Sequence, residues 1–130
     1  MDIKISVVCP TYNSSIYVSR AIDSILQQEE LPEEIIFSDD GSTDSTIKII
    51  ENFSDKFVNM GVIFKLLKNK HLGPGSARNK AIWESEGSWI AFLDSDDTWE
   101  PKKLKLIKQK ILQNNYNIIL HWENYLEIEF

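Results

Sequence analysis

The stretch Trp89-Ile90-Ala91-Phe92-Leu93 runs directly into Asp94-Ser95-Asp96-Asp97, so an apolar segment ends in a cluster of acids. A short apolar run with aromatic and β-branched side chains is typical of a strand buried on both faces of a parallel sheet. Ile3 to Cys9 forms a second such run, and Pro10 is expected to end it. Between the two runs, apolar residues also recur at helical spacing. The sequence therefore predicts an α/β fold with a mostly parallel central sheet covered on both faces.

The remaining elements are expected to follow the same alternation. Three further strands are expected, at residues 34–38, 62–67 and 117–122. The expected helices begin near Val18, Asp44, Gly75 and Pro101. The residues expected to cap or close them are Asn13, Ser14 or Ser15 for the first helix, Ser42 or Thr43 for the second and Gly87 for the third. In the last helix, the residues expected to face inward are Leu104, Ile107, Ile111 and Leu112.

The composition limits the classes of protein to which the chain can belong. Its 130 residues suffice for one domain, and 42% hydrophobic and 26% charged residues are ordinary globular values. The net charge of −6 argues against a general nucleic-acid-binding protein, which would present a basic surface. The single cysteine, Cys9, lies in an apolar run and is expected to be a buried, reduced thiol. Because no apolar stretch approaches the roughly 20 residues of a membrane span, we expect a soluble, cytoplasmic protein.

Three polar clusters follow predicted strands. Thr11-Tyr12-Asn13 follows the first strand, Asp39-Asp40 follows the second, and Asp94 to Asp97 follow the strand at 89–93. Ligands of open parallel sheets bind beyond the carboxyl ends of the strands, which is where these clusters meet. The sequence therefore predicts one ligand site along this edge of the sheet.

Asp94 and Asp96 are the strongest candidates for metal ligands in that site. Their i, i+2 spacing at the tip of a strand lets two carboxylates share a hard divalent cation such as Mn²⁺ or Mg²⁺. Crowded carboxylates also repel one another unless a cation compensates them. The alternative is a helix N-terminus rich in acids, because Pro101 is expected to open a helix just beyond.

The acids at the tip of the second strand suggest a different contact. Asp39 or Asp40 can accept hydrogen bonds from a base or a ribose, and we expect one of the two to do so. The residues that follow, Ser42, Thr43 and Asp44, fit an ordinary strand-to-helix turn with hydroxyl caps and a carboxylate at the positive helix end.

Basic residues of two kinds complete the pattern. Arg78, just after Gly73-Pro74-Gly75, is expected to aim its fork of donors at the phosphates of a ligand, and the alternative is a salt bridge to an acid. His71 and His121 lack the partners of a zinc site. The lysines at 102, 103, 105, 108 and 110 are expected to form a solvated helix face, and the alternative is docking on an anionic membrane surface.

Four stretches occur in a recognisable order and spacing: Ser6–Asn13, Ser38–Asp44, Asn69–Asn79, and Phe92–Asp97 with the following Trp99 and Pro101. They resemble the family 2 glycosyltransferases, and the resemblance covers residues 3 to about 112. It implies the GT-A fold, a nucleotide-binding α/β sandwich. It also implies transfer of a sugar, with inversion, from a nucleoside diphosphate sugar (most often a UDP-sugar) to an acceptor hydroxyl. A divalent metal, Mn²⁺ or Mg²⁺, would assist departure of the diphosphate.

The resemblance also implies roles for individual residues. Asp39, with its neighbour Asp40, resembles the carboxylate that reads the base. Asp94 resembles the first acid of the family's Asp-x-Asp motif, near the ribose and the metal, and Asp96 resembles the acid that binds the metal directly. The full set implied for the nucleotide sugar is Pro10, Thr11, Tyr12, Asn13, Asp39, Asp40, Arg78, Asp94 and Ser95, with Asp97 and Trp99 supporting the acidic loop.

The sequence departs from the family beyond these motifs. Family members continue into an acceptor-binding half, which supplies the general base, and Glu123, Glu127 and Glu129 come too early for that role. We therefore expect residues 1–130 to be a single nucleotide-sugar-binding domain, truncated at its C-terminus, with the base beyond residue 130. The alternatives are a non-catalytic nucleotide-sugar-binding module, an inactive remnant, or another metal-dependent phosphoryl enzyme such as a nuclease.

The family also implies a cellular setting. Its usual role is polysaccharide biosynthesis, with a saccharide or lipid-linked acceptor and no nucleic acid. A peripheral contact with the inner face of the membrane is left open. A homo-oligomer is also left open, because an unpaired sheet edge would invite pairing with a second copy.

Overall fold

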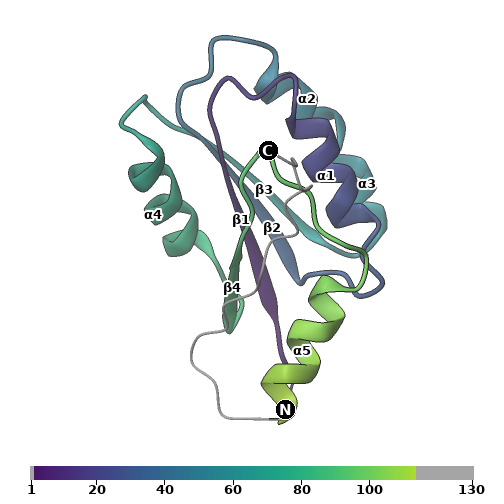
Figure 1. The fold of residues 1–130 in the computed structure, drawn as a ribbon. Helices are drawn as coiled ribbons and strands as arrows, with labels where there is room; N and C mark the ends of the chain where they lie inside the picture. The colour runs from purple at the N-terminus through teal and green to yellow at the C-terminus, as the bar shows by residue number, and fades with distance from the viewer. Residues whose placement is uncertain (1, 114–130) are drawn as a thin grey trace, which may run out of the picture.

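Four parallel strands form the sheet in the part of the chain that the computed structural model describes, residues 2–113 (Figure 1). They are β1 (Ile5–Thr11), β2 (Glu34–Asp39), β3 (Ile63–Lys68) and β4 (Trp89–Phe92), arranged in the order β3-β2-β1-β4. The helices are α1 (Val18–Leu26), α2 (Thr46–Asn52), α3 (Ser54–Asn59), α4 (Pro74–Glu84) and α5 (Lys103–Gln113). The two central strands are buried along their whole length. The predicted α/β fold with a parallel sheet is confirmed.

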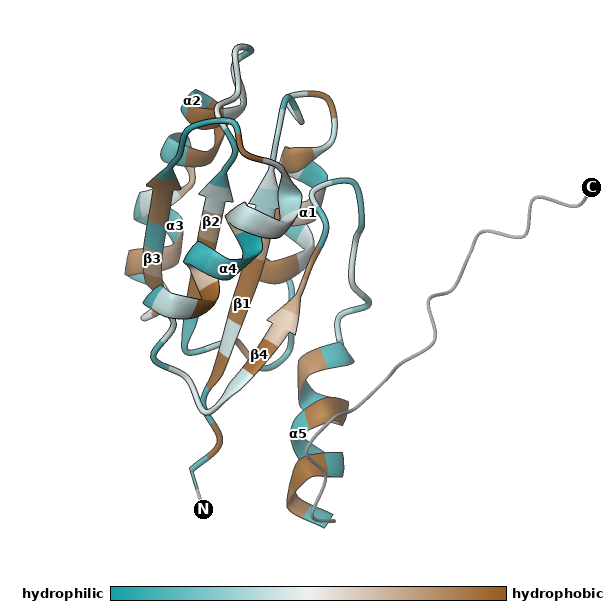
Figure 2. Cartoon of the chain, turned by 90° about the vertical axis from the view of Figure 1, so that its left-hand side faces the viewer, coloured by the Kyte–Doolittle hydropathy of each residue, from teal (hydrophilic) through white to brown (hydrophobic). Residues whose placement is uncertain are grey.

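The helices divide between the two faces of the sheet (Figure 1). α1, α2, α3 and α5 contribute to the larger core on one face. On the other face α4 lies across β1 and β2 (Figure 2). Ala81 of this helix packs with Val8 and Ile36. Phe92, which pairs with Val8 and therefore shares its face, is half-exposed.

β1 continues through Pro10 to Thr11, so the prediction that the proline ends this strand is wrong. The Val8 carbonyl accepts a hydrogen bond from the Leu93 amide, so every second residue of β1 turns its backbone polar groups toward β4. Pairing with β4 ends at Val8, and the missing N–H of Pro10 falls beyond that point. The strand tolerates the proline because no ladder hydrogen bond is lost.

α1 starts without a side-chain cap, so the prediction of Asn13, Ser14 or Ser15 in that role is wrong. The Tyr17 and Val18 amides donate to the backbone carbonyl of Ser14 instead, which forms a turn ahead of the helix. The polar side chains of this segment are thereby left to bond to neighbouring loops at the sheet edge.

The segment after β2 forms two short helices where one was expected. α2 begins after Ser45 without a side-chain cap, so the prediction of Ser42 or Thr43 as its cap is wrong. The Asp44 carboxylate accepts hydrogen bonds from the hydroxyl and the amide of Thr46. Partial burial opposes ionisation of Asp44, but these bonds outweigh it and lower the pKa of the carboxyl to about 2. Asp44 therefore remains an anion at the start of the helix, as its position predicts.

Gly87 does not close α4, contrary to the prediction, because the helix already ends at Glu84. The residue is needed for close approach of this loop to β1. A Cβ at Gly87 would lie 2.4 Å from the Ser6 Oγ and 2.8 Å from the Lys4 carbonyl oxygen. Only glycine fits that contact without displacing the strand.

α5 buries Leu104 and Ile111 as predicted, but Leu112 is 63% exposed and its predicted inward position is wrong. One residue beyond Ile111 lies about 100° further around the helix, away from the packed stripe. The predicted strand at 117–122, His121 and the three C-terminal glutamates lie outside the described residues. Among residues 2–113, every helix is too short or too polar to cross a membrane.

Candidate functional site

A cleft of about 420 Å³ opens at the carboxyl ends of the strands, the edge where the polar clusters are expected to meet. Its volume is within the range of small-molecule sites. The residues predicted from the sequence that line it are Pro10, Thr11, Tyr12, Asn13, Asp40, Arg78, Asp94, Ser95 and Asp96. The lining residues that the sequence analysis did not assign to the ligand site are Ser14, Tyr17, His71, Pro74 and Ala77. Asp39, predicted to contact the nucleotide sugar, is absent from the lining, as are Asp97 and Trp99, which were predicted to support the acidic loop.

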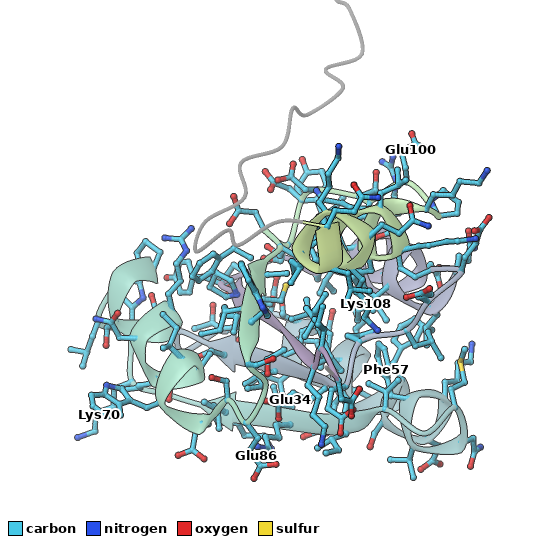
Figure 3. The ribbon with its side chains drawn as sticks, turned by 90° about the horizontal axis from the view of Figure 1, so that it is seen from below. Glu34, Phe57, Lys70, Glu86, Glu100 and Lys108 are labelled. Carbon is cyan, nitrogen blue, oxygen red and sulfur yellow. The ribbon has the colours of Figure 1, made fainter. Side chains whose placement is uncertain are left out.

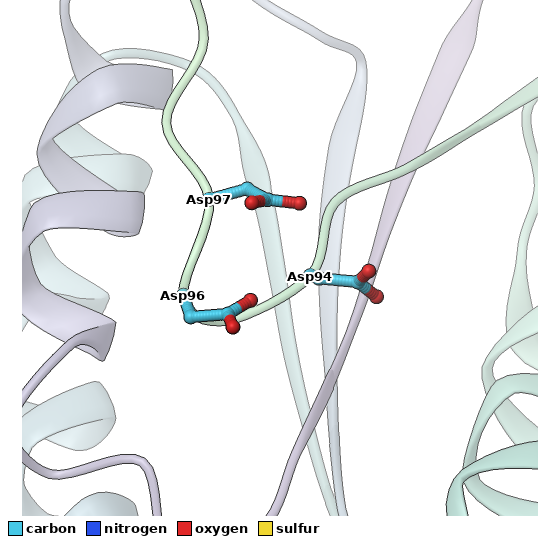
Figure 4. Close-up of side chains that lie close together, drawn as sticks. All are labelled: Asp94, Asp96 and Asp97. Atoms are coloured by element: carbon cyan, nitrogen blue, oxygen red, sulfur yellow. The ribbon is translucent and has the colours of Figure 1, made fainter. Parts of the chain in front are cut away.

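Asp94, Asp96 and Asp97 gather in the loop after β4, and one carboxylate oxygen from each lies within 4.8 Å of the others (Figure 4). The Asp97 amide donates to the Asp94 carbonyl at 3.0 Å, which closes a tight turn. α5 begins only at Lys103, so these acids do not form the first turn of a helix. Carboxylate oxygens without nitrogen or sulfur donors suit a hard divalent cation. The cluster therefore fits Mg²⁺ or Mn²⁺, and it adds Asp97 to the predicted pair.

The negative charge of this acidic cluster affects the pKa of the buried Cys9 thiol. Cys9 is fully buried in β1, as its apolar surroundings predict. Burial raises the pKa of its thiol far above the ordinary range, and the charges of Asp94, Asp96 and Asp97 raise the pKa further. Full burial and the raised pKa both disfavour the thiolate, which is the form that acts as a nucleophile or metal ligand.

Arg78 reaches from α4 to the same end of the cleft. Its Nη2 lies 3.1 Å from the Oδ1 of Asp94, and both side chains are partly exposed. The salt bridge named as the alternative is therefore formed, yet it places the guanidinium inside the cleft lining. An exposed ion pair contributes little to stability. A guanidinium has five N–H donors, so the contact with Asp94 does not use all of them.

The two aspartates at the tip of β2 have different surroundings. Asp39 is fully buried, and its carboxylate accepts the Thr11 hydroxyl at 2.7 Å and the Ser42 hydroxyl at 2.6 Å. Asp40 lines the cleft and accepts the backbone amides of Leu72 at 2.8 Å and Gly73 at 3.1 Å. Of the two, only Asp40 lines the cleft.

Ionisation of Asp40 is favoured by these bonds. Burial opposes the charged form, but the two loop amides and the neighbouring His71 outweigh burial and hold the pKa of this carboxyl below its ordinary value. The anion at Asp40 therefore pins the loop between β3 and α4 against the tip of β2.

Asn13 joins the loops after β1 and β2. Its backbone has φ = 45°, in the left-handed region that few residues other than glycine adopt. Its amide donates to the Ser42 Oγ at 2.9 Å, and its side-chain oxygen accepts the Thr43 amide at 2.8 Å. Besides lining the cleft, Asn13 thus holds the two loops together.

We expect Asn13→Ala to destabilise the protein by about 1–2 kcal/mol, because alanine resists the left-handed backbone and removes the acceptor of the Thr43 amide. Asn13→Gly should cost less, since glycine adopts this φ freely. Urea unfolding of both variants measures the difference. Equal losses in the two variants would show that the backbone conformation is not the cause.

Ser14 links the loop after β1 to the acidic loop. Its Oγ lies 2.7 Å from the Oγ of Ser95, and its amide donates to the Thr46 Oγ1 at 2.8 Å. The acidic loop is therefore tied to the loop after β1. No feature of the sequence distinguishes Ser14 from its neighbour Ser15.

The lysines of the last helix are largely engaged with other side chains. Lys105 lies 3.3 Å from Glu29 and Lys108 lies 3.7 Å from Glu30. The Lys103 Nζ sits 4.7 Å from the centre of the Trp99 ring. These contacts favour the solvated, ion-paired helix face over a free basic surface.

The chain resembles known proteins in both sequence and fold. The chain matches the model of Glycosyl transferase family 2 over residues 6–125. It is 38% identical over 120 residues to the Escherichia coli UDP-Glc:alpha-D-GlcNAc-diphosphoundecaprenol beta-1,3-glucosyltransferase WfgD, covering 91% of this chain and 45% of that protein.

Solved structures give the same picture. The crystal structure of S. aureus TarS 1-349 in complex with UDP-GlcNAc superposes with a TM-score of 0.75 at 34% identity, covering 87% of this chain and 32% of that chain. The mannosyltransferase PcManGT from Pyrobaculum calidifontis, in complex with GDP-Man and Mn²⁺, has a TM-score of 0.70 at 22% identity, covering 80% of this chain and 31% of that chain. The latter is a likeness of fold alone. The chain spans less than half the length of each of these three proteins.

Proposed function

Since this chain belongs to the family 2 glycosyltransferases and has the GT-A fold, we propose that it forms the donor-binding part of an enzyme that transfers a sugar from a nucleoside diphosphate sugar to an acceptor hydroxyl. The observation that carries the proposal is the convergence of Arg78 with Asp94 and Asp96 in one cleft at the carboxyl edge of the sheet. A cationic fork beside a cation-binding acid cluster suits a diphosphate.

The order of the strands orients the ligand. Asp40 directly follows β2, Tyr12 follows β1, and His71 and Asp94 lie in the loops after β3 and β4, so these residues succeed one another across the sheet. Three strand spacings amount to about 14 Å, enough for an elongated nucleotide. The base belongs at the Tyr12 and Asp40 end, where an aromatic ring and a carboxylate are present. The diphosphate belongs at the Arg78 and Asp94 end.

Asp94 and Asp96 would hold the divalent metal, with Asp97 as a third oxygen donor. When bound, Mn²⁺ or Mg²⁺ supplies positive charge that stabilises the departing diphosphate. Arg78 would donate hydrogen bonds to this diphosphate. The Ser14–Ser95 contact keeps the acidic loop at a fixed position relative to the nucleotide.

The acceptor hydroxyl is proposed to attack from the face opposite the diphosphate, which inverts the anomeric centre. A general base must take its proton, and we place that base beyond residue 130. The name of WfgD specifies a lipid-linked saccharide as its acceptor. This supports a lipid-linked or saccharide acceptor here too, used at the inner face of the membrane in polysaccharide synthesis.

Thermal unfolding with UDP, GDP, dTDP and CMP, each with and without Mn²⁺, tests the donor site. UDP with Mn²⁺ should raise the midpoint most, because WfgD is named for UDP-Glc and TarS was crystallised with UDP-GlcNAc. A ligand that binds only the folded state adds about 2.7 kcal/mol at a hundredfold excess over its Kd. No shift with any nucleotide would contradict the proposal. Nucleotide binding without sugar transfer by any longer form of the protein would favour a non-catalytic module.

A further inference from the structure

Tyr12 and His71 form an aromatic wall on the β3 side of the cleft. Their rings are stacked, with centroids 4.3 Å apart and planes inclined by 21°. The two residues come from loops that follow β1 and β3, which β2 separates in the sheet. Their contact therefore spans the tip of β2.

Asp40, at that tip, fixes the imidazole. The Nδ1 of His71 lies 2.9 Å from the Asp40 Oδ2 and 3.0 Å from the Asp40 carbonyl oxygen. The same carboxylate accepts the amides of Leu72 and Gly73, and Asp40 is only 3% exposed. The His71 ring is thus anchored by a buried group that does not depend on Tyr12.

Tyr12 keeps 45% of its surface exposed, although one face of its ring lies against His71. Both rings line the cleft, so the uncovered part of Tyr12 opens onto the ligand site. An aromatic ring is a stacking surface for a planar base, and holding it in place in advance removes the cost of ordering it on binding.

We propose that His71 is a positioning residue for the nucleobase: anchored by Asp40, it holds the Tyr12 ring so that the base stacks on the open face of Tyr12. The inference rests on the proposed function, and it gives a role to a residue that the sequence motifs left without one. It also gives a reason for Asp40 to bind both the His71 ring and the backbone amides of Leu72 and Gly73 in the same loop. Without the imidazole, Tyr12 loses the group that covers the back of its ring.

Three variants of the full chain separate the ring from the anchor. His71→Ala removes both, His71→Phe keeps a ring against Tyr12 without the contact to Asp40, and His71→Asn keeps a donor toward Asp40 without the ring. Calorimetric titration with UDP and Mn²⁺ should show affinity about tenfold weaker for the alanine and asparagine variants. The phenylalanine variant should recover most of the affinity. Pyrophosphate with Mn²⁺, which lacks a base, should bind all four proteins equally.

Each other outcome identifies what fails. Unchanged or tighter UDP binding by His71→Ala overturns the positioning role while leaving the donor site intact. An equal loss of affinity for pyrophosphate and for UDP shows that His71 acts only by holding the loop, and it overturns the positioning role. If the wild-type protein binds none of the nucleotides, the proposed function itself fails. Unfolding midpoints measured without ligand identify any variant whose fold is affected. If His71→Ala is destabilised, the UDP affinities of His71→Phe and His71→Asn decide whether the ring at this position matters.

Discussion

Asp96→Ala should abolish the stabilisation that Mn²⁺ and a nucleoside diphosphate give together. Asp96 supplies one of the three clustered carboxylate oxygens and lines the cleft. A hard cation held by so few protein oxygens is sensitive to the loss of any one of them. At a ligand concentration that stabilises the wild type by about 2.7 kcal/mol, the variant should show almost no shift in its unfolding midpoint.

The same variant should behave oppositely in metal-free buffer. Asp94, Asp96 and Asp97 repel one another when no cation compensates them, so removing one charge relieves the repulsion. With a chelator present, Asp96→Ala should therefore be at least as stable as the wild type. A variant that is less stable than the wild type with Mn²⁺ and nucleotide, but at least as stable as the wild type with chelator, has lost a metal ligand. General damage to the fold would lower its stability in both buffers.

Asp55→Ala is the matched control for this experiment. It removes the same charge from an exposed acid in the first turn of α3, outside the cleft lining. This variant should respond to Mn²⁺ and nucleotide like the wild type. If Asp96→Ala responds as fully as Asp55→Ala does, the acidic loop is not the metal site.

The fold was predictable because its deciding signals are short and local. The apolar runs at the first and fourth strands, separated by helical periodicity, are sufficient to indicate a covered parallel sheet, and that sheet is confirmed. The element ends were not predictable in the same way. Whether Pro10 ends a strand depends on which neighbour lies beside it, and whether Ser42 caps a helix depends on the competing carboxylate of Asp39. Both are tertiary facts.

The site was predictable to the extent that it follows strand ends. Asp40, Asp94 and Asp96 meet in one cleft because parallel strands end at one edge. The strand pattern left Asp39 and Asp40 as alternatives, and the family resemblance pointed to Asp39 as the base reader. The structure places Asp40, and not Asp39, in the cleft lining. Their separation into a buried and a cleft-facing carboxylate depends on strand pleat and loop packing. His71 was missed because its partners, Tyr12 and Asp40, come from distant parts of the chain.

A second polar cluster, at the opposite end of the sheet, carries the other large expected effect. Glu34 begins β2 with a fully buried side chain (Figure 3). Its Oε1 accepts the Ser6 hydroxyl at 2.6 Å and the Glu86 amide, and the Lys65 ammonium lies 3.0 Å from its Oε2. Burial opposes ionisation, but these partners outweigh it and hold the pKa of Glu34 below its ordinary value.

Glu34→Ala should cost about 3 kcal/mol of unfolding free energy, because it leaves the Ser6 hydroxyl, the Glu86 amide and the Lys65 ammonium without their shared acceptor. The lower end of the range for buried pairs applies, since the Lys65 side chain is 25% exposed and can turn toward water. Glu86→Ala is the matched control. It removes an exposed carboxylate 3.8 Å from the same ammonium, and it should cost less than about 1 kcal/mol.

The effect of pH on this difference has a definite sign. A carboxyl whose pKa is lowered by folding contributes stability that is complete above its unfolded pKa and is lost as the pH falls through its folded pKa. The gap in unfolding free energy between the wild type and Glu34→Gln should therefore be full at neutral pH and should shrink below the ordinary value of 4.5. Asp40 and Asp44 also have lowered pKa values, but both proteins contain them, so their contributions cancel when one unfolding free energy is subtracted from the other. Urea titrations of both proteins from pH 7 to pH 3 measure this difference, and a gap that stays constant over that range would show that ionised Glu34 does not stabilise the fold.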